Sequence, residues 1–127
     1  MDIEAAKQLC RSFPGCVEEV KWGDNLVFSV GTKMFAVTQV DASADAISFK
    51  VDDDRFLELT DRPGIIPAPY LARAKWVQVQ PAAQLSDAQA AALLRRSHAL
   101  VLAKLPRRQQ REITGADSPD DPAAAGA

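Results

Sequence analysis

The chain has 127 residues, enough to bury one hydrophobic core without a metal or a disulfide and too few for two domains of ordinary size. Its hydrophobic fraction of 47% and charged fraction of 25% exclude a disordered or fibrous protein. The net charge of −2 arises from Asp117, Asp120 and Asp121 near the end, so the nearly neutral remainder excludes a general attraction to polyanions.

The first predicted element is a short amphipathic helix. Asp2 is placed to cap it, apolar residues follow at helical spacing, and Pro14-Gly15 ends it. We expect one stripe of side chains to be buried against a sheet, namely Ile3, Ala6, Leu9, Cys10 and Phe13.

Between Glu18 and Val51, apolar side chains alternate with others, which is typical of β-strands. The alternation predicts strands over 26–30, 34–40 and 47–51, and a short one over 20–22. Gly31-Thr32 and the polar segment 41–45 supply turns. Because connections this short cannot cross over a sheet, we expect an antiparallel meander of about four strands.

The middle of the chain mixes short elements. Three aspartates at 52–54 predict the acidic N-terminus of a short helix; a metal site is less favoured, because adjacent helical positions point in different directions. Residues 62–69 hold three prolines and a glycine and predict an irregular loop, with one helical turn near Tyr70-Leu71. A last strand over 75–79 places Trp76 and Gln78 on one face and Val77 and Val79 on the other.

The clearest helix follows. Ser86-Asp87-Ala88-Gln89 fits a capping box, and an apolar stripe continues for about twenty residues until Pro106. Residues 114–127 contain little to bury and predict a disordered tail, so the single domain spans residues 1–113. The stripe consists of Ala90, Leu93, Leu94, Ser97, Val101 and Leu105.

The location of the protein is also predicted. No stretch reaches the roughly 18 apolar residues of a membrane span, and the first residues lack the features of a signal peptide. We therefore expect a cytoplasmic protein without a membrane partner. Its two cysteines, Cys10 and Cys16, would remain reduced there, and we interpret both as small core side chains.

Nine short segments together resemble the MmcQ/YjbR family over residues 2–111 in their order and spacing. They are Phe13-Pro14-Gly15, Trp22-Gly23, Lys33-Met34-Phe35-Ala36, Phe49-Lys50-Val51, Pro63-Gly64-Ile65-Ile66-Pro67-Ala68, Tyr70-Leu71, Lys75-Trp76-Val77, Ser97-His98 and Lys104-Leu105-Pro106.

This resemblance implies an α+β fold: a two-layer antiparallel sheet of about five strands with N- and C-terminal helices packed on it, related in shape to frataxin (the CyaY type) and to secretion chaperones. It also implies DNA binding through a so-called double-wing architecture. His98 departs from the family pattern, where an aromatic residue such as tyrosine is expected after the serine.

Basic side chains gather on and just beyond the last helix, where they could neutralise phosphates. The alternative is that they solvate a helix C-terminus and interact favourably with its dipole. The candidate nucleic-acid-binding residues are Arg95, Arg96, Lys104, Arg107, Arg108 and Arg111.

A second hypothesis is a protein-interaction or chaperone-like adaptor that presents an apolar surface. Trp22, Tyr70 and Trp76 are its candidate surface aromatics, because aromatic side chains dominate interface energetics when they are exposed. The alternative for each of them is a place in the core.

No catalytic site, metal site or cofactor is predicted. Ser97 and His98 are adjacent on a helix and cannot form a nucleophile–base pair, and the nucleotide-, phosphate- and zinc-binding signatures are absent. Iron binding of the frataxin kind would need more carboxylates near the first helix. We expect a non-enzymatic monomer whose partner is DNA or another protein.

Overall fold

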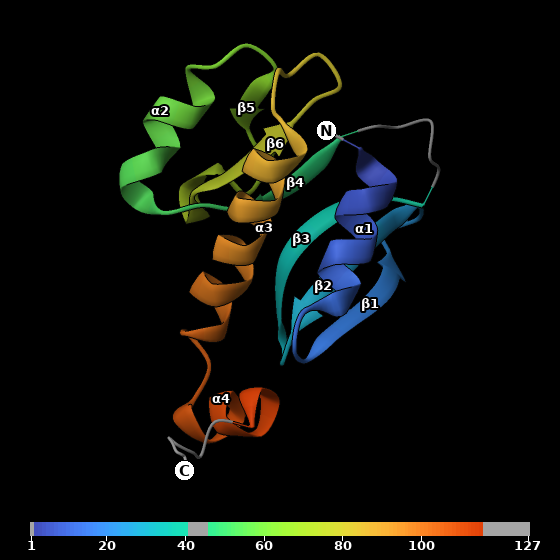
Figure 1. The fold of residues 1–127 in the computed structure, drawn as a ribbon, viewed down its shortest axis with the longest axis vertical. Helices are drawn as coiled ribbons and strands as arrows, with labels where there is room; N and C mark the ends of the chain where they lie inside the picture. Colours follow the sequence, from blue (N-terminus) through green and yellow to red (C-terminus); the bar gives the residue numbers. More distant parts are fainter. Residues whose placement is uncertain (1, 41–45, 116–127) are drawn as a thin grey trace.

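A six-stranded antiparallel sheet organises the fold, with the strand order β1-β2-β3-β4-β6-β5 (Figure 1). The computed structural model describes residues 2–40 and 46–115, so the predicted connection 41–45 and residues 116–127 of the predicted tail lie outside the described residues. The strands are β1 (Cys16–Lys21), β2 (Asn25–Val30), β3 (Lys33–Gln39), β4 (Ile47–Lys50), β5 (Ile65–Pro67) and β6 (Trp76–Val79).

The predicted antiparallel meander is confirmed, since β1 to β4 pair in sequence and every pairing is antiparallel. The strand predicted over 20–22 is longer and begins at Cys16. β5 was expected to be irregular and instead adds a sixth strand at the edge of the sheet. It has only three residues, and Pro67 is tolerated there because an edge strand can lack one N–H donor.

Two helices, α1 (Ile3–Ser12) and α3 (Asp87–Leu102), lie on the same face of the sheet (Figure 1). α1 contacts α3 and β1, whereas α3 contacts β2, β3 and β4. A short 3₁₀ turn (Asp53–Arg55) leads into α2 (Phe56–Thr60), which contacts β5 and β6. This arrangement confirms the predicted α+β fold with terminal helices packed on an antiparallel sheet.

Both predicted helix starts are confirmed in detail. The side chain of Asp2 accepts a hydrogen bond from the N–H of Glu4. At the start of α3, Ser86 and Gln89 exchange the two bonds of a capping box, each side chain accepting from the other residue's backbone N–H.

The last helix is shorter than predicted. α3 ends at Leu102, and after a turn the chain forms a separate helix, α4 (Arg107–Thr114). Pro106 explains the break, because proline disfavours helical geometry in the residue before it and occupies the N-cap position of α4 with an extended backbone. α4 also extends to Thr114, one residue beyond the predicted domain boundary.

The hydrophobic core lies between the sheet and the two helices. All six predicted stripe residues of the last helix are buried, including Leu105, which follows α3 in the turn. Of the first helix, Ile3, Ala6 and Cys10 are buried, and Leu9 and Phe13 pack at the edge of the core. The sheet contributes its largest buried side chains to this core: Phe28, Phe35, Ile47, Phe49, Val77 and Val79.

The opposite side of the sheet, here called the open face, faces away from α1 and α3. Directly paired residues share one face, and alternate residues point to opposite faces. Phe49 points into the core, so its neighbour Ser48 belongs to the open face. The register then places one row of open-face residues across four strands: Val27, Val37, Ser48 and Gln78.

Across the described ranges 2–40 and 46–115, no helix has both the length and the apolar character that a membrane crossing requires.

Candidate functional site

α4 carries the densest group of positive charges, and it is held in place by its less exposed side. Ile113 packs against the core at Gly15, where an added Cβ would come within 2.6 Å of Ile113 Cγ2. The side-chain amide of Gln110 donates to the carbonyl oxygen of Leu105 at 2.7 Å. These contacts fix the helix to the turn after α1 and to the turn that precedes α4 itself.

The arginines of α4 lie on its opposite, exposed side. At 3.6 residues per turn, Arg107, Arg108 and Arg111 fall within about 100° of the helix circumference. All three are exposed, as is Lys104 in the preceding turn. We call these four residues the basic cluster. A shallow groove of about 480 Å³ is lined by Ala103, Arg107, Gln110, Arg111 and Thr114.

The other two predicted cations, Arg95 and Arg96, lie on α3. The guanidinium of Arg96 binds the Asp52 carboxylate through Nε at 2.9 Å and Nη2 at 2.8 Å. Hydrogen bonding to Arg96 lowers the pKa of Asp52. Arg95 is exposed. Arg96 is therefore occupied by a structural ion pair, and the six predicted residues are not equivalent.

The same ion pair changes the interpretation of the aspartates at 52–54. Asp52 occupies the N-cap position of the 3₁₀ turn, but its side chain makes no capping hydrogen bond. It binds Arg96 instead, which joins the end of β4 to α3. Asp53 and Asp54 lie in the first turn of this 3₁₀ segment, which therefore has the acidic N-terminus that was predicted.

Lys50, which is not among the predicted binding residues, adds a positive charge near Lys104 of the basic cluster. Burial lowers the pKa of Lys50, and the positive charge of Lys104 lowers it further. Its Nζ donates to the carbonyl oxygen of Ala74. Because Lys50 and Lys104 are far apart in the sequence, only the packing of α3 on β4 could reveal that they are neighbours.

The three predicted surface aromatics separate into two groups. Trp76 is only 4% exposed, so the prediction that it lies at the surface is wrong. It is on the open face, but the segment before it folds back on the strand: the N–H of Ala68 donates to the Trp76 carbonyl and the N–H of Trp76 to that of Leu71. Trp22 is 67% exposed and Tyr70 is fully exposed.

Trp22 and Tyr70 line a common groove of about 510 Å³ on the open face. We call it the open-face groove. Residues from the β1–β2 turn, β2, β3, β4, β6 and the segment after β5 contribute to it, and none of them is charged. The lining residues are Trp22, Asn25, Met34, Val37, Ser48, Ala68, Pro69, Tyr70, Leu71 and Gln78.

Ser97 and His98 point to different partners. The hydroxyl of Ser97 donates to the carbonyl oxygen of Phe35 at 2.7 Å and accepts from the N–H of Lys50 at 3.1 Å. The imidazole Nε2 of His98 lies 2.8 Å from the carbonyl oxygen of Pro14. Each side chain therefore satisfies backbone groups of a neighbouring element.

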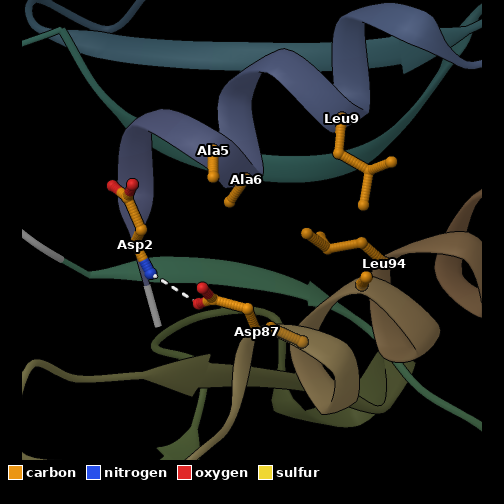
Figure 2. Close-up of a pocket in the computed structure, with 8 residues that line it drawn as sticks. Asp2, Ala5, Ala6, Leu9, Asp87 and Leu94 are labelled. Carbon is orange, nitrogen blue, oxygen red and sulfur yellow. Dashed lines mark hydrogen bonds between the residues drawn. The ribbon is translucent and has the colours of Figure 1, made fainter.

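A smaller cleft of about 180 Å³ separates α1 from α3. Figure 2 shows Ala5, Ala6 and Leu9 on one side and Leu94 on the other, with Leu9 and Leu94 directed toward each other. At its end the N–H of Asp2 donates to the Asp87 carboxylate at 3.2 Å. The lining is otherwise aliphatic, so we interpret the cleft as the packing seam of the two helices.

Within the part of the chain that the structure describes, no three His, Cys, Asp or Glu side chains gather in a way that could hold a metal ion. Cys10 is buried and Cys16 is half-buried, and neither forms a disulfide. Burial raises the pKa of Cys10 to about 12 and that of Cys16 to about 11. Both thiols are thus protonated near neutral pH.

Comparison with known proteins places these features in a family. Among solved structures, protein DR2400 from Deinococcus radiodurans, which carries domain DUF419, is 28% identical with a TM-score of 0.75, over 88% of this chain and 87% of that one. A protein from Pseudomonas syringae is 20% identical with a TM-score of 0.66, over 80% of this chain and 99% of that one. No curated protein matches.

The YjbR family model matches residues 11–100. This span contains the whole sheet and most of α3, and it ends before the turn that leads to α4. The match covers well over half of the sequence and agrees with the resemblance carried by the nine short segments. The chain therefore belongs to the YjbR family.

Proposed function

We propose that the protein binds the phosphate backbone of double-stranded DNA through the basic cluster. The observation that carries this proposal is the exposed arginine face of α4, where Arg107 and Arg111 also line a shallow groove. Arginine is well suited to phosphate because its guanidinium presents several N–H donors in a planar fork. The MmcQ/YjbR resemblance implies DNA binding but does not locate it on α4, because the family model matches only residues 11–100.

The charge distribution sets the expected character of the complex. A near-neutral body supplies no long-range attraction, so the affinity must come from the few cations of the basic cluster. Phosphate contacts position a protein on DNA without reading its sequence. We therefore expect weak binding with little sequence preference, and a modest number of counterions released.

The test measures binding to a fluorescent DNA duplex by anisotropy as a function of salt. Three to four phosphate contacts predict that the affinity falls about 40- to 150-fold between about 50 and 200 mM salt. Replacing Arg107 and Arg108 by glutamine should weaken binding and reduce the fall to about 3- to 12-fold over the same range.

The matched control replaces two exposed arginines elsewhere by glutamine, namely Arg73 and Arg55, of which Arg55 is ion-paired with Glu58. This control changes the net charge equally. If the two double variants lose affinity to the same extent, net charge rather than the basic cluster governs binding, and the proposal fails. Equal thermal melting of the variants and the parent ensures that the comparison concerns binding and not folding.

A protein partner is a second candidate, because β1 is an edge strand with exposed apolar side chains. Val17 is 50% exposed and Val20 is 60% exposed, beside Trp22 in the following turn. An edge strand can add a strand from a partner. The test is to capture a partner with the parent protein, identify it, and repeat the capture with the Val20→Lys variant. Loss of that partner would support this role, and its retention would oppose it.

That the protein is monomeric, cytoplasmic and non-enzymatic stays a prediction.

A further inference from the structure

The open-face groove combines features of a small-molecule site. Its volume of about 510 Å³ lies within the usual range for ligand pockets, which are mostly apolar with a few polar groups. Apolar side chains of Met34, Val37 and Leu71 line it, and Ser48, Asn25 and Gln78 supply its polar atoms. The absence of charge among the ten lining residues favours an uncharged ligand.

Ser48 provides a second, independent observation. Its side chain lies on the open face and lines the groove, yet Ser48 is only 9% exposed. Its hydroxyl has no hydrogen-bond partner among residues 2–40 and 46–115. A buried hydroxyl without a partner is unfavourable, and such exceptions in a folded protein ask for an explanation. Ser29 is a second buried serine of the open face without a partner in these residues, and only Ser48 lines the groove. At Ser48, a ligand with a polar edge would supply the missing hydrogen bond.

Gln78 lies directly opposite Ser48 in the β4–β6 pair. The Oε1 of Gln78 accepts a hydrogen bond from Gln80 at 3.4 Å, but its side-chain amide nitrogen has no acceptor in the described part of the chain. The groove therefore offers a hydroxyl and an amide donor next to each other. This pair matches a ligand edge that carries ring nitrogens or carbonyl oxygens.

The two aromatic residues are held in an unusual backbone conformation. Trp22 has φ +52° and Tyr70 has φ +67°, a left-handed region that bulky residues rarely occupy. Because both side chains are exposed, their burial contributes little free energy to offset this backbone strain. Strain retained at exposed aromatics that line one groove points to a role in binding, where each ring offers a flat stacking surface.

We propose that the open-face groove binds an uncharged planar heteroaromatic ring of nucleobase size. The ring stacks on Trp22 and Tyr70, and its polar edge bonds the Ser48 hydroxyl and the Gln78 amide. The three arginines of the basic cluster are remote from this site, since α4 docks beside the turn after α1, and α1 lies on the other side of the sheet. The proposal does not depend on DNA binding.

The test titrates the ¹⁵N-labelled protein with adenosine and follows the amide and indole N–H signals by NMR. Adenosine at about 10 mM would nearly saturate a site with a Kd of about 1 mM. The Trp22 indole signal and the amide signals of Val37, Ser48 and Gln78 should shift, whereas those of α4 should not. Failure of these groove signals to move would overturn the proposal.

Variants separate the individual contacts. Tyr70→Ala removes a fully exposed side chain and should weaken adenosine binding about tenfold. Ser48→Ala should weaken it by a similar factor. Ser29→Ala is the matched control, because Ser29 is a buried serine on the same open face that does not line the groove, and it should bind as the parent does.

Other probes define the ligand chemistry. Cyclohexanecarboxamide has a polar edge without a planar aromatic ring, and equal binding of it would contradict stacking. Adenosine monophosphate binding at least tenfold more tightly than adenosine would contradict an uncharged ligand. N-acetyltryptophanamide binding more tightly than adenosine would assign the groove to a protein side chain instead. The variant with Arg107 and Arg108 replaced by glutamine should bind adenosine normally, so failure of the DNA proposal would leave this one standing.

Discussion

His98 joins α3 to the end of α1, because its imidazole Nε2 lies 2.8 Å from the carbonyl oxygen of Pro14. A hydrogen bond there requires the ring proton on Nε2, which then donates to the oxygen. The ring also lies between Phe13, at a centroid distance of 5.0 Å, and Phe35, which it meets edge-on at 5.2 Å. The histidine thus occupies an aromatic position of the core and adds a hydrogen-bond donor.

We predict that His98→Phe lowers the free energy of unfolding by about 1 kcal/mol, because the ring contacts remain and only the hydrogen bond is lost. His98→Ala should cost more, about 3 kcal/mol, since it also leaves a cavity between two phenylalanines. Urea denaturation measures both. Equal losses for the two variants would show that the Pro14 bond, rather than ring packing, dominates. Arg95→Gln, an exposed change on the same helix, should have little effect.

Ser97 should be more sensitive than its small size suggests. Its fully buried hydroxyl bonds the backbone of both β3 and β4, so Ser97→Ala leaves the Phe35 carbonyl and the Lys50 N–H without partners. We expect a loss of about 2–4 kcal/mol in the free energy of unfolding. Ser29→Ala, at a buried serine without a partner in the described residues, should cost less than about 1 kcal/mol. Similar losses at both serines would refute the bridging role.

Gly15 should be essential for the placement of α4. Its φ of +72° and its contact with Ile113 leave no room for a Cβ. Gly15→Ala should therefore lose about 1–2 kcal/mol through backbone strain and about 1–3 kcal/mol more through overpacking. Amide hydrogen exchange in α4 should accelerate, because the helix loses its docking contact.

The control for this substitution is Gly23→Ala. Gly23 also has a positive φ, +90°, but nothing lies within 4 Å of an added Cβ. The loss of stability in Gly23→Ala should therefore come from backbone strain alone. Adding Ile113→Ala to Gly15→Ala should restore part of the lost stability. Unchanged exchange in α4 with Gly15→Ala would mean that the contact with Ile113 does not hold the helix.

Local patterns predicted much of this fold. The capping residues Asp2 and Ser86 act within one helical turn, and the alternation of β2, β3 and β6 depends only on neighbouring residues. Leu105 was expected to continue α3 because its spacing from Val101 is helical. It is buried as predicted, although Pro106 ends the helix earlier and a turn carries Leu105 into the core.

The parts that were missed depend on contacts between distant segments. Trp76 alternates as predicted, but it is buried because residues 68–74 fold back on its strand, which no local pattern specifies. The open-face groove brings Trp22 from a turn next to Ser48 and Gln78 from separate strands, and this proximity follows from strand register. Arg96 was assigned to nucleic acid because its partner, Asp52, lies 44 residues away in the sequence.

The buried thiols make the stability of the protein depend on pH in the alkaline range. Burial raises the pKa of Cys10 from 9.0 to about 12 in the folded state, so the unfolded chain loses this proton first. The stabilising contribution of the buried, protonated Cys10 thiol is fully present below about pH 9 and is lost as the pH rises toward 12, because the unfolded state then binds fewer protons than the folded one.

The Cys10→Ala variant lacks this thiol and therefore this dependence of stability on pH, although it leaves a small cavity. Urea denaturation of the parent and of Cys10→Ala at pH 7, 9 and 10.5 should therefore show a difference that narrows above pH 9. A constant difference would mean that the Cys10 thiol titrates equally in both states and is not protected by the core.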